Sequence, residues 1–426
     1  MRGFLFECKK VVKKKTTLIA ISLSILAAIG LYMFNHSVAE DIEQGNISRL
    51  ESFPEIFLNF ANETKEEKEK AFVAGDTAKA EEFDRDIDHY QEAIVNYEKL
   101  KKSFEEEDWE TLYEKDFNEM QIFIDDPNGA VYKIEEQELS NFTIRATYEE
   151  IKILKENKSK PFIQNTIYQS FLPTIYDDFT GSSLEHWESE TKRYGREGFS
   201  FLIQLIQLLY IPAVVLIGCF IFGNNISTEA TKKNRGMNLY KVLPYSRLKL
   251  FFAKYLSGYM YLLVYSMVMM AIPLICSLFT NGLGSLENPI LVYEGSQPSL
   301  FGNSLNPMVD QFHFIDYREY FGKVILFLAV FSFFMYSIYF LLAIQIKSAT
   351  ISLILLGTIT YLGMTHLVSK FNPFIYTDFH KIITGETATL TYNLEITYTT
   401  GLILYLLVGI ALSLIGYIKF RFKRQL

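Results

Sequence analysis

The chain alternates long apolar runs with charged segments in a way that predicts membrane-spanning helices. Each of six runs lacks Asp, Glu, Lys and Arg and is close to the ~20 residues that carry a helix across ~30 Å of hydrocarbon. Irregular backbone cannot face lipid, so each run is predicted to be helical, with kinks at Pro212 and Pro273. Six runs of this length argue against buried helices of a soluble protein. The runs cover residues 16–34, 199–222, 255–279, 324–346, 349–368 and 398–418.

The polar segment between the first two runs, 35–197, carries helical periodicity of its own. Apolar residues recur every three or four positions, first in Phe83, Ile87, Tyr90, Ile94, Tyr97, Leu100 and Phe104, and then in Trp109, Leu112, Tyr113, Phe117 and Met120. Two such stripes predict a helical hairpin. The expected fold is an all-α integral membrane protein with six transmembrane helices and a mainly helical extracellular domain. The expected domains are 1–34 (an elbow helix and the first span), 35–197, and 198–426, which contains a cytoplasmic loop at 223–254.

The distribution of basic residues predicts the orientation of these helices. With both termini in the cytoplasm, the cytoplasmic segments hold 18 Lys and Arg residues and the two short outer loops hold 4. Residues 35–197 have a net charge of −20, while the rest of the chain has +12. A basic body of this kind fits anionic inner-leaflet lipid and a cytoplasmic partner, and it needs no nucleic acid. The first run is longer than the core of a cleavable signal peptide, so an anchor is the preferred interpretation.

The loop between the second and third runs contains the clearest local pattern. Glu229 leads a polar turn, Lys232, Lys233 and Arg235 follow, and Gly236 permits a backbone bend. A short apolar stretch then ends at Pro244, and Ser246 is a predicted N-cap for the next helix. This pattern predicts a short helix on one membrane face, placed to contact a soluble partner. The predicted contact residues are Glu229, Lys232, Lys233, Arg235, Gly236, Leu239, Leu243, Pro244, Ser246, Arg247 and Lys254.

A Glu, a Gly, a Leu-Pro-x-Ser-Arg block and a Lys in this order resemble the coupling-helix loop of type 2 ABC exporter permeases. The N-terminal FECKKVVKKKTT and the segment NPFIYTDFHKIITG are also similar to that family. The resemblance covers residues 1–34 and 199–426. It implies a bacterial cell-membrane permease that docks on a separate ABC ATPase, with a second permease copy or paralogue beside it. ATP and Mg would then bind the ATPase, and this chain would hold no cofactor.

The polar domain contains one dense acidic run, Glu105, Glu106, Glu107 and Asp108. One interpretation is a surface for a cationic ligand such as an antimicrobial peptide. The other is a solvated helical cap, since acidic faces of exported helices often serve solubility alone.

Enzymatic motifs do not occur in the sequence. There is no G-x-x-x-x-G-K-S/T loop, the six histidines lack metal-site spacing, and Ser, Cys and His form no nucleophile motif. The function expected from the resemblance is export of a substrate, and spans without charged residues favour a peptide or amphiphile as cargo. Two alternatives remain open: a sodium extrusion permease, and a non-transporting sensor or immunity module against antimicrobial peptides. The sequence does not identify the cargo.

Overall fold

The computed structural model describes residues 2–126, 132–134, 137–166, 170–230, 246–295, 297–298, 305–306 and 311–422. These residues are mostly helical, which confirms the predicted fold class. The chain divides into two compact units, one of Met1–Phe34 with Glu197–Leu426 and one of Asn35–Arg196. We call the first the membrane unit and the second the inserted unit. Helix α2 (Lys15–Val73) contributes residues to both.

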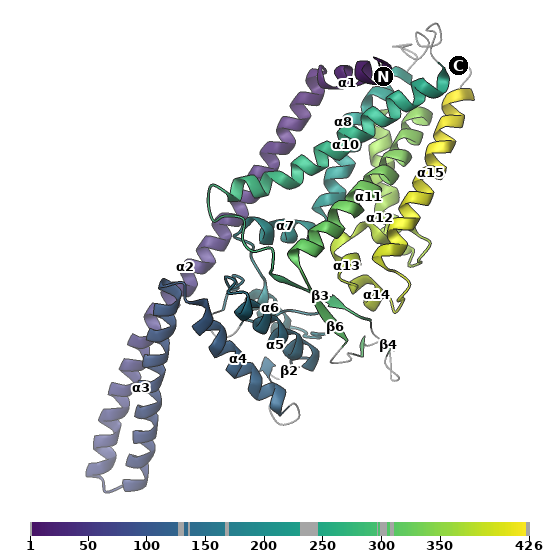
Figure 1. Ribbon diagram of the computed structural model, residues 1–426. Helices are drawn as coiled ribbons and strands as arrows, with labels where there is room; N and C mark the ends of the chain where they lie inside the picture. The colour runs from purple at the N-terminus through teal and green to yellow at the C-terminus, as the bar shows by residue number, and fades with distance from the viewer. Residues whose placement is uncertain are drawn as a thin grey trace. The chain divides into compact units, whose positions relative to one another are not determined.

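The membrane unit is a bundle of long apolar helices (Figure 1). Within the described residues, five helices are long and apolar enough to cross a membrane, and a bent pair, α7–α8, raises the number to six. In Figure 1, α1 and the end of α15 lie at one end of the bundle, and α13 and α14 lie at the other. The helices are α1 (Arg2–Val12), α2, α7 (Gly198–Gln207), α8 (Tyr210–Ala230), α10 (Arg247–Ser277), α11 (Tyr317–Ile346), α12 (Ala349–His366), α13 (Phe379–Ile383), α14 (Glu386–Leu390) and α15 (Tyr398–Phe422), with a 3-10 turn η1 (Pro373–Thr377).

Short strands connect α10 to α11. Strand β3 (Pro289–Tyr293) pairs antiparallel with β6 (Phe312–Asp316), and β4 (Gln297–Pro298) pairs with β5 (Leu305–Asn306). Asp316 then caps the start of α11, where its carboxylate accepts a hydrogen bond from the Glu319 amide at 2.7 Å.

Helix α11 is the centre of the bundle, because it packs against α8, α12 and α15 and is the most buried of the candidate spans. Phe327, Phe331 and Phe334 are fully buried along it. All three rings contact Tyr405 of α15, with centroids 5.0–5.3 Å apart. A helix that is apolar all round is expected in such a position.

The second apolar run is not one continuous helix, which corrects the prediction for residues 199–222. Helices α7 and α8 are bent by 76° at a break at Leu208 and Leu209. The predicted kink at Pro212 explains where the break lies. Pro212 has no amide hydrogen to give to the Leu208 carbonyl, and its ring clashes with that carbonyl in a continuous helix. Pro212 is instead tolerated in the first turn of the new helix α8.

The inserted unit begins with a long antiparallel helix pair. Helix α3 (Thr77–Glu105) runs back along the last part of α2, where Phe53 and Phe57 stack on Tyr97 at 4.9 and 5.6 Å. Helix α4 (Trp109–Asp125) follows, so both predicted apolar stripes are helical. The predicted hairpin of α3 and α4 left out a third helix, because α3 contacts α2 as well as α4.

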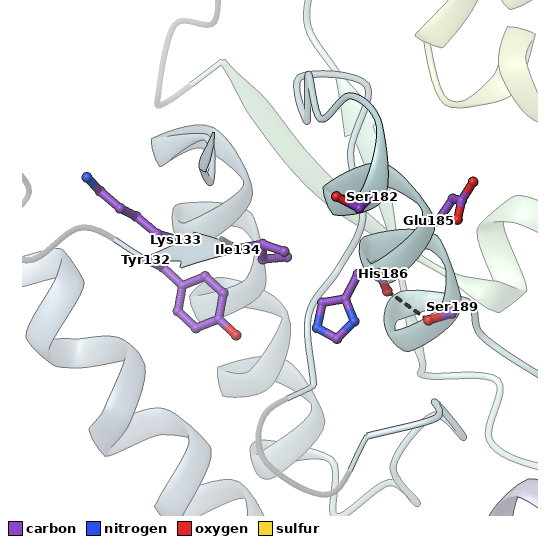
Figure 2. A pocket seen from close by; sticks show the side chains of 7 residues that line it. All are labelled: Tyr132, Lys133, Ile134, Ser182, Glu185, His186 and Ser189. Atoms are coloured by element: carbon purple, nitrogen blue, oxygen red, sulfur yellow. Dashed lines mark hydrogen bonds between the residues drawn. The ribbon is translucent and has the colours of Figure 1, made fainter. Parts of the chain in front are cut away.

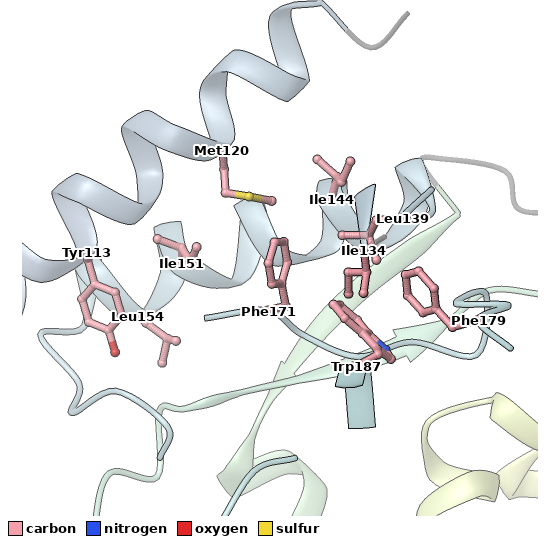
Figure 3. Packing of buried hydrophobic residues seen from close by; sticks show 10 residues of the cluster. All are labelled: Tyr113, Met120, Ile134, Leu139, Ile144, Ile151, Leu154, Phe171, Phe179 and Trp187. Atoms are coloured by element: carbon pink, nitrogen blue, oxygen red, sulfur yellow. The ribbon is translucent and has the colours of Figure 1, made fainter. Parts of the chain in front are cut away.

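The core of the inserted unit lies between α4, α5 (Asn141–Glu156) and α6 (Ser182–Thr191), with a two-stranded sheet of β1 (Lys133–Ile134) and β2 (Gln137–Glu138). Figure 3 shows Met120, Ile151, Phe171 and Trp187 directed into this core. An ion pair with a buried carboxylate lies in the same unit. Arg193 donates two hydrogen bonds to the Glu150 carboxylate, at 2.7 and 2.5 Å, and thereby fixes the segment that leaves the unit.

Candidate functional site

The predicted contact loop starts at the end of α8 and returns at the start of α10. Glu229 lies in the last turn of α8, and Ser246 caps α10 by accepting a hydrogen bond from the Lys249 amide at 3.3 Å. The N-cap prediction for Ser246 is thus confirmed. Residues 231–245 lie outside the described residues. The predicted residues within that stretch are Lys232, Lys233, Arg235, Gly236, Leu239, Leu243 and Pro244.

Two of the predicted contact residues are bonded to each other inside the protein. The Lys254 ammonium lies 2.6 Å from a Glu229 oxygen and 2.9 Å from a Glu7 oxygen. Lys10 of α1 pairs with the other oxygen of Glu229. The side chains of Lys254, Glu7 and Glu229 are only 5, 6 and 9% exposed. We call these four residues the charge cluster.

The charge cluster connects three elements that are far apart in the sequence. Glu7 and Lys10 come from α1, Glu229 from α8 and Lys254 from α10, and the cluster has two positive and two negative charges. Pairing within the cluster is required, because an isolated buried charge costs several kcal/mol. Burial, followed by the nearby Lys254 charge, lowers the pKa of Lys10. Tyr261 of α10 adds a hydrogen bond to the Cys8 carbonyl at 3.3 Å, so α1 is tied to α10 at a second point.

Sequence reasoning missed Glu7, although a signal was present. Glu7 is the only acidic residue among the first 15, which otherwise contain six Lys and Arg residues. It also lies three positions before Lys10, and residues three apart occupy one face of a helix. A single acid on the inner face of a basic amphipathic helix indicates a buried basic partner.

Arg247, by contrast, is exposed at the start of α10. Its guanidinium donates to the Arg421 carbonyl near the end of α15 at 2.8 Å. Free carbonyls at a helix C-terminus favour a cation, so this contact is electrostatically favourable. The structure therefore separates the predicted loop residues into a buried pair, Glu229 and Lys254, and an exposed residue, Arg247.

The acidic run of the inserted unit forms the turn between α3 and α4. Glu105 ends α3, Glu106 is its C-cap, and Glu107 has a positive φ of 56°. Asp108 is the N-cap of α4, and hydrogen bonds from the Thr111 side chain and backbone lower its pKa. Lys101 and Lys102 lie one turn before the acids, 3.8 Å from Glu105 and Glu106 respectively. These residues have local roles in the turn, whichever interpretation of the run holds.

A polar cavity of about 540 Å³ lies elsewhere in the inserted unit, between β1 and one face of α6. Figure 2 shows Tyr132 and His186 facing each other across it. It is lined by Tyr132, Lys133, Ile134, Ser182, Glu185, His186 and Ser189, so it contains none of the predicted ligand residues. Across the described residues, no group of three His, Cys, Asp or Glu residues is arranged to hold a metal ion.

Together, the candidate spans indicate a multi-pass membrane protein. The sequence profile described as ABC-2 family transporter protein matches residues 14–418. The chain therefore belongs to the ABC-2 transporter family. Its members are non-catalytic membrane permeases that pair with ABC ATPase subunits, and the ATPase binds ATP. Searches of curated proteins and of solved structures found no match.

Proposed function

We propose that the chain is the permease subunit of a bacterial ABC exporter that moves a peptide or another amphiphile out of the cell. Two permease subunits, identical or related, pair with a separate ATPase that binds ATP and Mg. The charge cluster is the observation that carries this proposal, because it joins the two ends of the loop to each other and to α1. A displacement of the loop then moves α8 and α10 together.

The orientation in this proposal places both termini and residues 223–254 in the cytoplasm. The excess of Lys and Arg in those segments supports it. The inserted unit is then extracellular, and the exposed Arg247 is available to the ATPase. A basic guanidinium suits carboxylates on a partner protein.

The cargo assignment rests on the composition of the spans. The six apolar runs contain no Asp, Glu, Lys or Arg. Buried ionisable residues are frequent along the paths of small ions, because each is costly unless it is functional. Their absence favours a large apolar or amphiphilic cargo over a bare sodium ion.

The test uses the full-length chain co-expressed with the ATPase encoded beside its gene and reconstituted in lipid nanodiscs. Arg247→Ala should reduce co-purification of the ATPase, because it removes an exposed contact. Lys254→Met should leave co-purification intact but reduce stimulation of ATP hydrolysis, because it disconnects the loop ends from each other. Lys370→Met is the matched control, since Lys370 pairs with the exposed Glu395 at 2.6 Å, away from the loop.

Normal docking and stimulation in an Arg247→Ala, Lys254→Met double variant would contradict this use of the loop. Docking would then have to occur elsewhere, for instance at Lys347 between α11 and α12.

A second candidate function is capture of a cationic peptide by the inserted unit, with signalling through the same ATPase. The polar cavity and the net charge of −20 over residues 35–197 favour it. Uptake of a labelled cationic peptide into inverted vesicles separates the two functions. ATP-dependent uptake supports export, whereas binding without uptake supports sensing.

A further inference from the structure

The last residue of α7 is bonded to a histidine from a distant part of the chain. The Gln207 side-chain nitrogen lies 3.3 Å from His380 Nε2 of α13. The other ring nitrogen, His380 Nδ1, lies 3.1 Å from Tyr320 Oη of α11. We call these three residues the His380 node. It joins the end of α7, directly before the 76° bend, to the central helix of the bundle.

The chemistry of the three groups fixes the protonation state of the ring. An amide nitrogen only donates, so His380 Nε2 accepts from Gln207 and the ring hydrogen is on Nδ1, where it donates to Tyr320 Oη. The bond from Gln207 requires a neutral imidazole, because a protonated Nε2 cannot accept a hydrogen bond. Burial, with the Lys381 cation second, lowers the pKa of His380 to about 4, so the ring is neutral at pH 7.

The backbone next to Gln207 is strained. Leu209 has a φ of +59°, in the left-handed region that costs a residue with a side chain roughly 1–2 kcal/mol. Such a conformation persists only where the surrounding structure holds it in place. The contacts on both sides of Leu209 are therefore what maintains the bend.

Three of those contacts are separate from the node. At the start of α7, the amides of Gly198 and Phe199 donate to the carbonyls of Gly282 and Leu283 at 3.1 and 2.9 Å. After the bend, the Tyr210 hydroxyl donates to the Met269 carbonyl of α10 at 3.0 Å. These bonds fix the first residues of α7 and the first residue of α8. The node adds a side-chain hydrogen bond at the last residue of α7, beside the apolar packing of Leu205 and Ile206.

His380 is itself held firmly. Asp378 caps α13 by accepting from the Lys381 amide at 3.1 Å, and Thr384 Oγ donates to the His380 carbonyl at 2.8 Å. The Tyr320 ring is fully buried and meets the His380 ring edge-on, with centroids 5.8 Å apart. The imidazole thus presents Nε2 to Gln207 from a rigid base.

We propose that His380 is a positioning residue that holds the bent pair α7–α8 in its bent form through Gln207. Loss of the Gln207 bond frees the end of α7 and lets Leu209 leave its left-handed conformation. Glu229 of the charge cluster lies in the last turn of helix α8, so the bent pair has polar attachments at its bend and at the end of α8. This role goes beyond the loop contact proposed above.

Two substitutions of His380 test its bond to Gln207 and its bond to Tyr320 separately. In His380→Gln the side-chain amide reaches the position of Nε2, so contact with Gln207 is retained. In His380→Asn the amide reaches only the position of Nδ1, so contact with Tyr320 is retained and contact with Gln207 is lost. Gln207→Met removes the same bond from the other side. Gln207 is exposed, so this variant is expected to fold.

The measurement is hydrogen–deuterium exchange of the full-length chain in detergent micelles, read for peptides within residues 198–209. His380→Asn and Gln207→Met should raise exchange there by about fivefold, because one hydrogen bond is worth about 1 kcal/mol. His380→Gln should stay near wild type. Exchange in α12 and α15, which contribute no residue to the node, serves as the internal control for folding and should not change.

Equal increases in His380→Asn and His380→Gln would show that His380 acts through packing alone and would overturn the proposal. Wild-type exchange in Gln207→Met would overturn it as well. Because the experiment needs neither substrate nor ATPase, its outcome is independent of the proposed export activity.

Discussion

Lys254 is a charged residue on a largely apolar helix, and its ammonium group is bonded to carboxylates from two other segments. Lys254→Met should destabilise the membrane unit by about 3–5 kcal/mol, because it leaves two buried carboxylates without their common partner. Glu229→Gln should cost less, about 1–3 kcal/mol, because Lys254 keeps Glu7. Lys10→Met should cost at most about 1 kcal/mol, because the Lys10 side chain is 37% exposed.

Melting temperatures of the purified variants check this order. Lys370→Met, at an ion pair in which Glu395 is 66% exposed, should melt close to wild type. If Lys254→Met melted like Lys370→Met, the charge cluster would contribute no more than a surface pair.

The contributions of His380 and its neighbour Asp378 to the stability of the folded protein should depend on pH with opposite signs. Folding lowers the pKa of His380 from 6.5 to about 4, so its contribution to stability is present above pH 6.5 and is lost as the pH falls toward 4. Burial raises the pKa of Asp378 from 3.8 to about 6, so its contribution is present below pH 3.8 and is lost as the pH rises through 6. The other nearby titratable groups are Lys381, Glu386 and Tyr320.

Differences in melting temperature between wild type and each variant isolate these effects. The stability advantage of wild type over His380→Gln should shrink as the pH falls from 6.5 to 4, by at most about 3 kcal/mol. The stability advantage of wild type over Asp378→Asn should grow over the same fall in pH. Parallel curves for wild type and His380→Gln would show that His380 has the same pKa in the folded and unfolded states.

Among the elements, the α2–α3 pair depends most on aromatic contacts. The Phe57 ring lies 5.6 Å from Tyr97 and 6.1 Å from Tyr90, and all three side chains are half-buried. Phe57→Ala should therefore destabilise this pair by about 1–3 kcal/mol, below the 3–5 kcal/mol of a fully buried Phe. Exchange of α3 amides should increase while exchange of α5 stays unchanged, because α5 belongs to a separate cluster of the core.

Val95→Ala on α3 is the matched control, since Val95 is 62% exposed and its truncation should have little effect. An increase in exchange throughout α3, α4 and α5 in Phe57→Ala would show instead that the inserted unit unfolds as one cooperative body.

The sequence predicted elements well where one physical requirement dominates. Lipid demands long apolar helices, so five of the six apolar runs lie in single helices that can span a membrane, and Pro212 indicated the break in the second run. The continuation of α2 beyond Phe34 was missed, because Gly45 and Pro54 suggest interruptions and the helix contains both. The apolar pattern also changes at Phe34, and a pattern alone does not distinguish a new helix from a continuing one.

At the scale of the whole molecule, the charge cluster and the His380 node depend on contacts between residues far apart in the sequence, which no local sequence pattern predicts. Glu229 and Lys254 were selected by resemblance, but Glu7 is 247 positions from Lys254 and no spacing rule connects them. His380 was considered only as a metal ligand, because its partners Gln207 and Tyr320 are 173 and 60 positions away. Charges and polar groups buried between helices become visible only when the helices are packed.

The orientation of the chain in the membrane stays a prediction, and the structure supplies the positions that test it. Val73 ends α2 and is 87% exposed, and Leu248 is the second residue of α10 and is 46% exposed. In a chain without its three native cysteines, Val73→Cys should react with an impermeant maleimide on intact cells. Leu248→Cys should react only after permeabilisation, because basic segments stay in the cytoplasm. Ser227→Cys, at a position only 1% exposed, should react in neither case and controls for leakage into the protein interior. Labelling of Leu248→Cys on intact cells would reverse the orientation and remove the loop from the reach of a cytoplasmic ATPase.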